Sequence, residues 1–172
     1  MPASASPWTV CKFGGTSVST RSRWETIAAL AQRHIERGVR PLLVCSALSG
    51  VSDRLDAILN AETPEARTEQ VAAIQAQHTE LARALDLEAD AVLTDAFARL
   101  ETRVSGLPNN ASASPQQRAA LMAQGELLST RLGAAFLQAQ DLTTHWLDAR
   151  DVLRSEREAH LTPARRYLSA TC

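Results

Sequence analysis

Lys12, Gly14, Gly15 and Thr16 form the first group of residues whose types and spacing could do chemistry. The two glycines follow a short run of strand-forming residues, so the backbone can turn tightly there and expose its N–H groups. A helix that begins after such a turn adds the positive end of its dipole, and Lys12 adds a full positive charge. This combination favours a bound phosphate, although the spacing of a Walker A loop is absent. The turn by itself still favours the simpler interpretation, an ordinary strand-to-helix connection with a surface lysine.

Ser46 and Ser52 form a second group, in a small-residue stretch from Val44 to Asp53. Hydroxyl groups and backbone donors at the end of a strand suit a small anionic ligand. A turn that satisfies its own hydrogen bonds, with Ser52 capping the next helix, explains these residues equally well.

Glu126 is the third candidate, and it lies in the stretch from Gly125 to Ser129. A carboxylate can bind and orient an ammonium group through a charge-assisted hydrogen bond. A glutamate on a helix is more often a solvated surface charge, and composition alone favours that interpretation. An apolar stripe nearby places Glu126 close to the buried side of its helix; the stripe contains Leu121, Leu128 and Leu132.

The first 60 residues contain the elements that would position the first two groups. Residues 8–12 and 41–47 have strand character, and the second run is continuously apolar, as expected for a strand covered on both faces. A helix is predicted from residue 22 to about 37, with Gly38 as its left-handed cap, and another after Asp53 through about residue 60. Two strand-turn-helix units predict an α/β fold with a parallel sheet, and both turns then lie at its C-terminal edge.

A long helical segment follows, from residue 63 to about 140, where the composition shifts to Ala, Leu, Gln, Glu and Arg. Thr63 and Ser114 each precede a proline, as N-caps do, and Ser114 has capping-box spacing to Gln117. The pattern predicts three helices, over residues 64–85, 89–105 and 115–140.

Residues 143–148 resemble a third strand, and the chain beyond Asp151 carries no clear pattern. Residues 1–7 are predicted to be a disordered leader, rich in Ala, Ser and Pro. A parallel sheet of three strands would need more cover than this chain provides, so we expect 8–172 to be one incomplete domain.

The composition excludes several classes of protein. The chain has 172 residues, with 18 Lys and Arg against 19 Asp and Glu, a balance that argues against binding to nucleic acid or to an anionic membrane. The first residues lack the features of a secretory signal, so we expect a cytoplasmic protein. Three cysteines and four histidines show no metal-ligand spacing, and no metal site is predicted; reduced, buried thiols are expected.

Four segments together resemble the aspartate kinases of the amino-acid kinase superfamily. The heptad Lys-Phe-Gly-Gly-Thr-Ser-Val at 12–18 is similar to the N-terminal signature of that family. Residues 46–52 resemble its Ser-Ala-x-x-Gly-x-Thr segment, with Ser52 in place of the usual threonine, and residues 125–129 resemble its Gly-Glu-x-x-Ser motif. A weaker similarity covers residues 146–150, to which no chemistry is assigned.

The resemblance implies a three-layer sandwich with a mainly parallel sheet, and an enzyme that phosphorylates the side-chain carboxylate of L-aspartate with MgATP. The product, 4-phospho-L-aspartate, leads to lysine, threonine and methionine. Lys12 is then the catalytic residue that meets the transferred phosphoryl group. Gly14, Gly15 and Thr16 join it in binding the phosphates of ATP, and the remaining candidates, Ser46, Ser52 and Glu126, bind aspartate.

The family continues with a Gly-Arg-Gly-Gly-Ser-Asp stretch and a nucleotide-binding half that this sequence does not contain. We therefore expect the aspartate-binding portion without most of the adenine and ribose site, and a homo-oligomer for a full-length protein. Four alternatives stay open: a piece of a longer or bifunctional enzyme, a kinase for another carboxylate, a non-catalytic binding module that partners a full-length subunit, and a plain helical scaffold.

Overall fold

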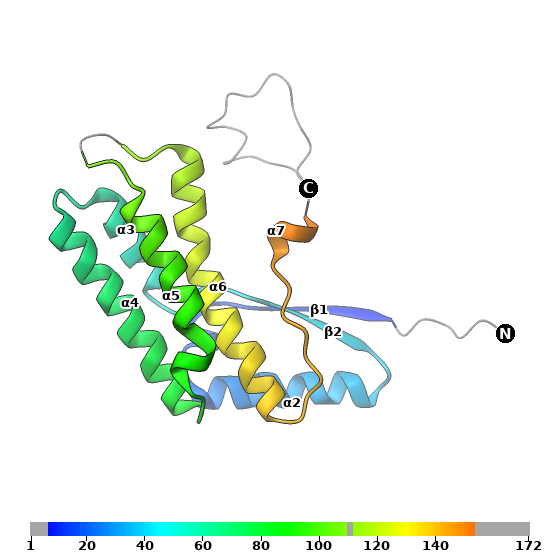
Figure 1. Cartoon of the computed structure of the whole chain (residues 1–172). Coiled ribbons are helices and arrows are strands. Elements are labelled where there is room, and N and C mark those ends of the chain that lie inside the picture. Colours follow the sequence, from blue (N-terminus) through cyan, green and yellow to red (C-terminus); the bar gives the residue numbers. More distant parts are fainter. Residues whose placement is uncertain (1–6, 110–111, 154–172) are drawn as a thin grey trace, which may run out of the picture.

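The computed structural model describes residues 7–109 and 112–153. The chain forms a small sheet beside a bundle of helices (Figure 1). The sheet has two parallel strands, β1 (Trp8–Phe13) and β2 (Arg40–Cys45), paired in register from Trp8 with Arg40 to Phe13 with Cys45. Both strands run toward the bundle, so the turns that follow them lie at the same edge of the sheet. The predicted convergence of the two turns is therefore confirmed.

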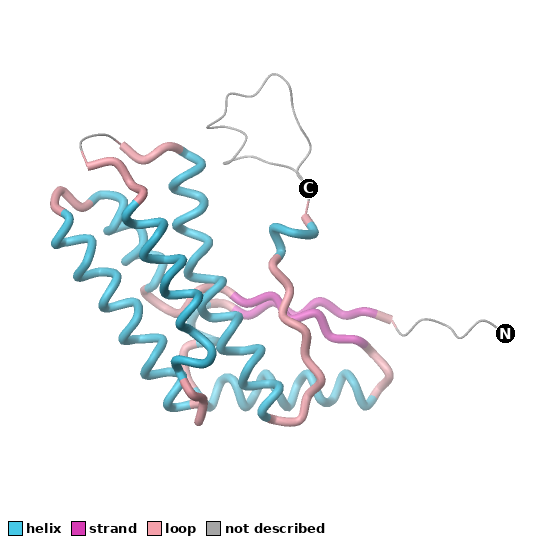
Figure 2. Tube along the Cα trace, in the orientation of Figure 1, coloured by secondary structure: helices cyan, strands magenta, loops and turns pink. Residues whose placement is uncertain are grey.

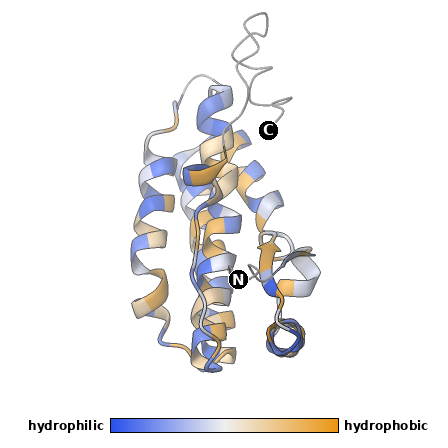
Figure 3. Ribbon diagram, turned by 90° about the vertical axis from the view of Figure 1, so that its right-hand side faces the viewer, coloured by the Kyte–Doolittle hydropathy of each residue, from blue (hydrophilic) through white to orange (hydrophobic). Residues whose placement is uncertain are grey.

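Helices α1 (Gly15–Val18) and α2 (Arg21–Glu36) connect the two strands. Figure 3 shows α2 end-on below the sheet, with the bundle standing to one side of both. The end of α2 is a Schellman motif, in which the Val39 N–H donates to the His34 carbonyl and Gly38 has φ +73°. Gly38 therefore takes the left-handed position that the sequence predicts.

The bundle consists of α3 (Val51–Asn60), α4 (Pro64–Ala84), α5 (Ala89–Ser105) and α6 (Pro115–Ala139) (Figure 2). The last three reproduce the predicted helices to within one residue. Thr63 accepts a hydrogen bond from the Ala66 N–H, and Ser114 forms a full capping box with Gln117. Local capping chemistry thus fixes where these helices begin.

The hydrophobic core lies mainly between the bundle helices, and α6 is its centre because it packs against α2, α3, α4 and α5. The stripe of leucines predicted on α6 is fully buried; it comprises Leu121, Leu128 and Leu132. No helix in the described ranges combines the length and the apolar character needed to cross a membrane.

The predicted third strand is wrong. Residues 143–148 form an extended segment that pairs with no strand in the described part of the chain, followed by the short helix α7 (Ala149–Val152). Its Trp146 instead donates a hydrogen bond from Nε1 to the Thr130 hydroxyl of α6, at 3.0 Å. Strand propensity reflects side-chain shape and burial, and here a helix surface supplies that burial.

Two other expectations fall partly outside the described residues. The predicted leader lies there except for Pro7, and so do Cys172 and the C-terminal residues from 154 onward. Cys45 is a buried free thiol as expected, whereas Cys11 is half-buried rather than buried.

Candidate functional site

The first candidate group lies where β1 ends and α1 begins. Lys12 is exposed, and a Cβ atom placed on Gly14 would lie 3.8 Å from the Lys12 Nζ, so the ammonium group lies over the glycine turn. Gly15 begins α1, and Thr16 is exposed in its first turn. The charge of Lys12 and the turn predicted to bind phosphate therefore occupy the same end of the sheet.

The second group lies at the end of β2, directly beside the first. The Ser46 N–H donates to the Phe13 carbonyl at 3.0 Å, which continues the parallel ladder past the end of the strands. A Cβ atom on Gly15 would lie 2.8 Å from the Ala47 carbonyl oxygen, closer than real Cβ atoms come. The absence of a side chain at Gly15 is what allows the two turns to touch.

A serine hydroxyl links the same two turns. Ser19 Oγ donates to the Gly15 carbonyl at 2.7 Å and accepts from the Ser49 N–H at 2.9 Å. One side chain thereby satisfies a backbone group in each turn, which reduces their freedom to move apart. Sequence reasoning did not identify Ser19.

Ser52 lies in the first turn of α3, where it is exposed. The N-cap of α3 is Gly50, with φ +80° and no side-chain cap, so the alternative interpretation in which Ser52 caps this helix is wrong. A left-handed residue favours glycine, and Gly50 takes that conformation without steric cost.

The third group approaches the second turn from the other side. A Cβ atom on Gly125 would lie 2.7 Å from the Ala47 Cβ, and Ser129 Oγ donates to the Ser46 carbonyl at 2.7 Å. Helix α6 therefore docks its Gly125 and Ser129 side onto the end of β2. Glu126 lies between them in sequence, and it is exposed.

Ala47 is the point where the three groups meet. Its carbonyl faces Gly15 and its methyl group faces Gly125, and the side chain is buried. Lys12, Gly14, Gly15 and Ser46 are thereby brought to one edge of the sheet. The carboxylate of Glu126 has no hydrogen bond or ion pair with any residue that the structure describes.

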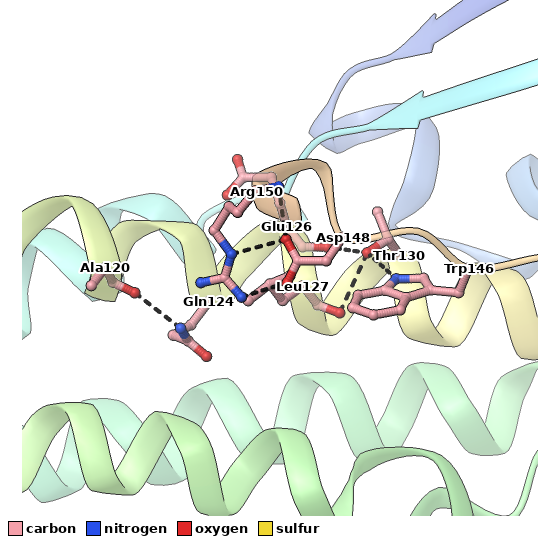
Figure 4. Close-up of polar contacts among 8 residues, drawn as sticks. All are labelled: Ala120, Gln124, Glu126, Leu127, Thr130, Trp146, Asp148 and Arg150. Atoms are coloured by element: carbon pink, nitrogen blue, oxygen red, sulfur yellow. Dashed lines mark hydrogen bonds and ion pairs between the residues drawn. The ribbon is translucent and has the colours of Figure 1, made fainter. Parts of the chain in front are cut away.

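The segment after α6 runs back along the side of that helix that carries Glu126 and Thr130 (Figure 4). Thr130, one turn after Glu126, donates from its hydroxyl to the Glu126 carbonyl at 2.6 Å and accepts from Trp146. The guanidinium of Arg131 stacks 4.1 Å from the centre of the Trp146 ring. These contacts hold the segment against the part of α6 that carries Glu126.

Two charged residues of that segment form a local pair. Arg150 donates from Nε and from its backbone N–H to the Asp148 carboxylate, at 2.9 and 3.0 Å. These contacts lower the pKa of Asp148, mainly through the side-chain hydrogen bond from Arg150. Asp148 is therefore an ionised N-cap of α7, as its position before that helix indicates.

Cys45 is the one thiol next to these turns within the described ranges, and its chemistry is unfavourable for nucleophilic attack. Burial raises its pKa to about 11, so the thiol stays protonated near neutral pH. The chemistry open to this edge of the sheet is the binding of anions by Lys12 and the backbone amides, and the binding of a cation by Glu126.

Comparison with known proteins agrees with this picture. The model of the amino acid kinase family matches residues 7–170. The chain is 31% identical over 155 residues to the bifunctional aspartokinase/homoserine dehydrogenase 1, chloroplastic, of Arabidopsis thaliana, which covers 85% of this chain and 17% of that protein. It is 31% identical over 148 residues to the lysine-sensitive aspartokinase 3 of Escherichia coli strain K12, which covers 85% of this chain and 32% of that protein.

Solved structures give the same result for the fold. The E. coli aspartokinase III in complex with aspartate and ADP, in its R-state, superimposes with a TM-score of 0.74 at 26% identity. The match covers 87% of this chain and 32% of that one. The complex of the same enzyme with lysine and aspartate, in its T-state, gives a TM-score of 0.73.

The chain thus spans a third or less of these relatives, and within that span its fold is the expected α/β fold of this group, with an incomplete sandwich. The family model covers nearly all of the chain, and it includes the three groups of residues that meet at Ala47. This chain belongs to the amino acid kinase family.

Proposed function

We propose that this chain forms the aspartate-binding side of an aspartate kinase. The reaction would transfer the γ-phosphoryl group of MgATP to the side-chain carboxylate of L-aspartate and yield 4-phospho-L-aspartate, a precursor of lysine, threonine and methionine. The observation that carries the proposal is the contact of Ala47 with both Gly15 and Gly125, since it joins the predicted phosphate turn to the helix of Glu126. Relatives named as aspartokinases, and a neighbour that contains aspartate and ADP, support it.

The phosphate side of the proposed site needs positive charge and backbone donors. The attacking carboxylate of aspartate is ionised near neutral pH, so the reaction needs no general base. The protein's task is to position two anions and to neutralise the charge that develops between them. Lys12 supplies that charge, and the amides of Gly14 and Gly15, with Thr16, would bind the phosphates.

The amino-acid side of the proposed site needs one carboxylate and several hydroxyls. Glu126 would bind the ammonium group of aspartate, and the exposure of its carboxylate leaves it accessible to a ligand. Ser46 and Ser52 would contact the carboxylates from the turn and from the start of α3. Magnesium enters this scheme as part of the nucleotide substrate.

The test is an acyl-phosphate assay, in which hydroxylamine traps the product as a hydroxamate. The chain is incubated with MgATP and with aspartate, glutamate or N-acetylglutamate in parallel. Hydroxamate formed with aspartate alone supports the proposal, whereas preference for another acid identifies a different kinase. Calorimetry with aspartate accompanies the assay: preferential binding of aspartate over glutamate is the result expected of an aspartate-binding side, and no binding rejects the assignment.

A further inference from the structure

Ser129 carries a buried hydroxyl with two hydrogen-bond acceptors, one distant in sequence and one within its own helix. It is fully buried, and its Oγ lies 2.7 Å from the Ser46 carbonyl and 3.2 Å from the Glu126 carbonyl. The shorter distance joins α6 to the end of β2, 83 residues away in sequence. A buried hydroxyl is costly unless it is hydrogen-bonded, so this contact also fixes the position of the helix.

Gly125 repeats the contact one helical turn earlier. Residues four apart lie on the same face of a helix, so Gly125 and Ser129 face the same turn. The Gly125 backbone approaches the Ala47 methyl group, and Ser129 binds the adjacent carbonyl of Ser46. Ser46 and Ala47 are therefore held by Ser129 and Gly125, which lie one helical turn apart on α6 and flank Glu126 in sequence.

The opposite side of the turn is held by Ser19, through the Ser49 N–H. The stretch 46–49 is therefore fixed by a hydroxyl from α6 and a hydroxyl from the start of the chain. Of these two, Ser129 alone belongs to the helix that carries Glu126.

We propose that Ser129 is a positioning residue for aspartate: its hydroxyl sets the separation between Ser46 and Glu126 without touching the substrate. This inference rests on the proposed function, because it takes Ser46 and Glu126 as the groups that bind the two ends of the amino acid. With Ser129 in place, the spacing between Ser46 and Glu126 is fixed before aspartate binds. The entropic cost of ordering these groups on binding is therefore small.

The experiment compares the whole chain with Ser129→Ala, which removes the hydroxyl, and Ser129→Cys, which keeps a weaker donor of similar size. Thr102→Ala is the matched control, because Thr102 donates to the Ala98 carbonyl within α5 and joins no second element. Ile74→Val controls for a small loss of stability in the core of α4. Aspartate affinity is measured by calorimetry, and amide hydrogen exchange is followed over residues 46–50.

Ser129→Ala should weaken aspartate binding by about tenfold, the equivalent of one ordinary hydrogen bond. Exchange over 46–50 should rise, Ser129→Cys should recover part of both effects, and the two controls should match the unsubstituted chain. If exchange in Ser129→Ala stays unchanged, or if it rises while aspartate affinity does not fall, the inference is overturned. If the unsubstituted chain binds no aspartate, the proposed function fails, and hydrogen exchange alone then decides whether Ser129 holds the turn.

Discussion

The indole ring of Trp24 lies directly against the backbone of Gly133. A Cβ atom at position 133 would be 1.9 Å from Cη2 of the ring, far inside any possible contact distance. Trp24 is 1% exposed, and its Nε1 donates to the Val18 carbonyl at 2.8 Å, so the ring has two fixed attachments. Helices α2 and α6 can therefore meet at this distance because residue 133 has no side chain.

Gly133→Ala should lower the free energy of unfolding by about 1 to 3 kcal/mol, because the new methyl group overpacks the Trp24 site. The better helix propensity of alanine offsets up to about 1 kcal/mol of that loss. Urea denaturation measures the change. Gly106→Ala is the control: its Cβ would lie 3.4 Å from the nearest atom, the Thr102 carbonyl oxygen, and φ is not left-handed, so its effect should stay within about 0.5 kcal/mol. Equal stability of the two variants would contradict the Trp24 contact.

In a full-length context that supplies the nucleotide-binding half, Lys12→Met should reduce kcat in the hydroxamate assay by about 100-fold or more, because the lysine charge would stabilise the transferred phosphoryl group mainly in the transition state. KM for aspartate should change less than about threefold. Arg40→Met is a matched control, since Arg40 shares the exposed face of the sheet with Lys12 but lies at the opposite end, over the Trp8 ring. A rise in KM for aspartate with unchanged kcat would show that the role of Lys12 is misassigned.

Glu126→Gln should weaken aspartate binding by about 10- to 100-fold, since a neutral amide replaces the carboxylate that would face the ammonium group. Calorimetry gives the affinity. Glu80→Gln removes the same charge from an exposed position on α4 and should leave the affinity as it is. An unaltered affinity in Glu126→Gln would return Glu126 to the class of solvated surface charges.

His78 should make the fold less stable in mild acid. It is fully buried, its Nδ1–H donates to the Ile74 carbonyl at 2.7 Å, and its Nε2 meets no polar partner among the described residues. Burial lowers its pKa below the ordinary value near 6.5, and the bond to Ile74 opposes this in part. The unfolded chain therefore takes up a proton first as the pH falls.

Stability from this group is complete above pH 6.5 and declines below it, until the pH passes the lowered pKa of the folded state. Denaturation at pH 7.5 and 5.5 should differ by about 1 kcal/mol through this residue. His78→Leu removes the titrating group, so the difference should shrink by that amount. An identical pH dependence in the variant would mean that His78 has the same pKa in the folded and unfolded states, against the prediction.

Asp141 and Asp86 follow the ends of α6 and α4 in left-handed conformations, with φ of 59° and 58°. Asp141→Gly should stabilise the chain by about 1 kcal/mol, since glycine adopts this conformation freely and the substitution removes a negative charge at a helix C-terminus. Asp86→Gly should give a smaller gain, because Asp86 also pairs with Arg21. Thermal unfolding of the two variants compares them, and a larger gain at position 86 would contradict the argument.

The sequence alone predicted the local structure closely wherever the signal was local. Thr63 and Ser114 mark helix starts because their hydroxyls accept the backbone N–H group three residues later, an interaction contained within a few residues. Gly38 marks the end of α2 for a similar reason. The convergence of the turns after β1 and β2 was also predictable, because parallel strands end at the same edge.

Contacts between distant residues were decided by the tertiary structure. Residues 143–148 have strand composition, but a strand requires a neighbouring ladder, and in the described structure Trp146 is bound by Thr130 of α6 instead. Gly125 and Ser129 belong to a motif that the sequence shows, but their contacts depend on which turn α6 packs against. Sequence patterns thus determined which residues form each element, because propensity and capping act over a few residues. The packing of those elements determined which backbones meet, because close approach depends on the shapes of both surfaces.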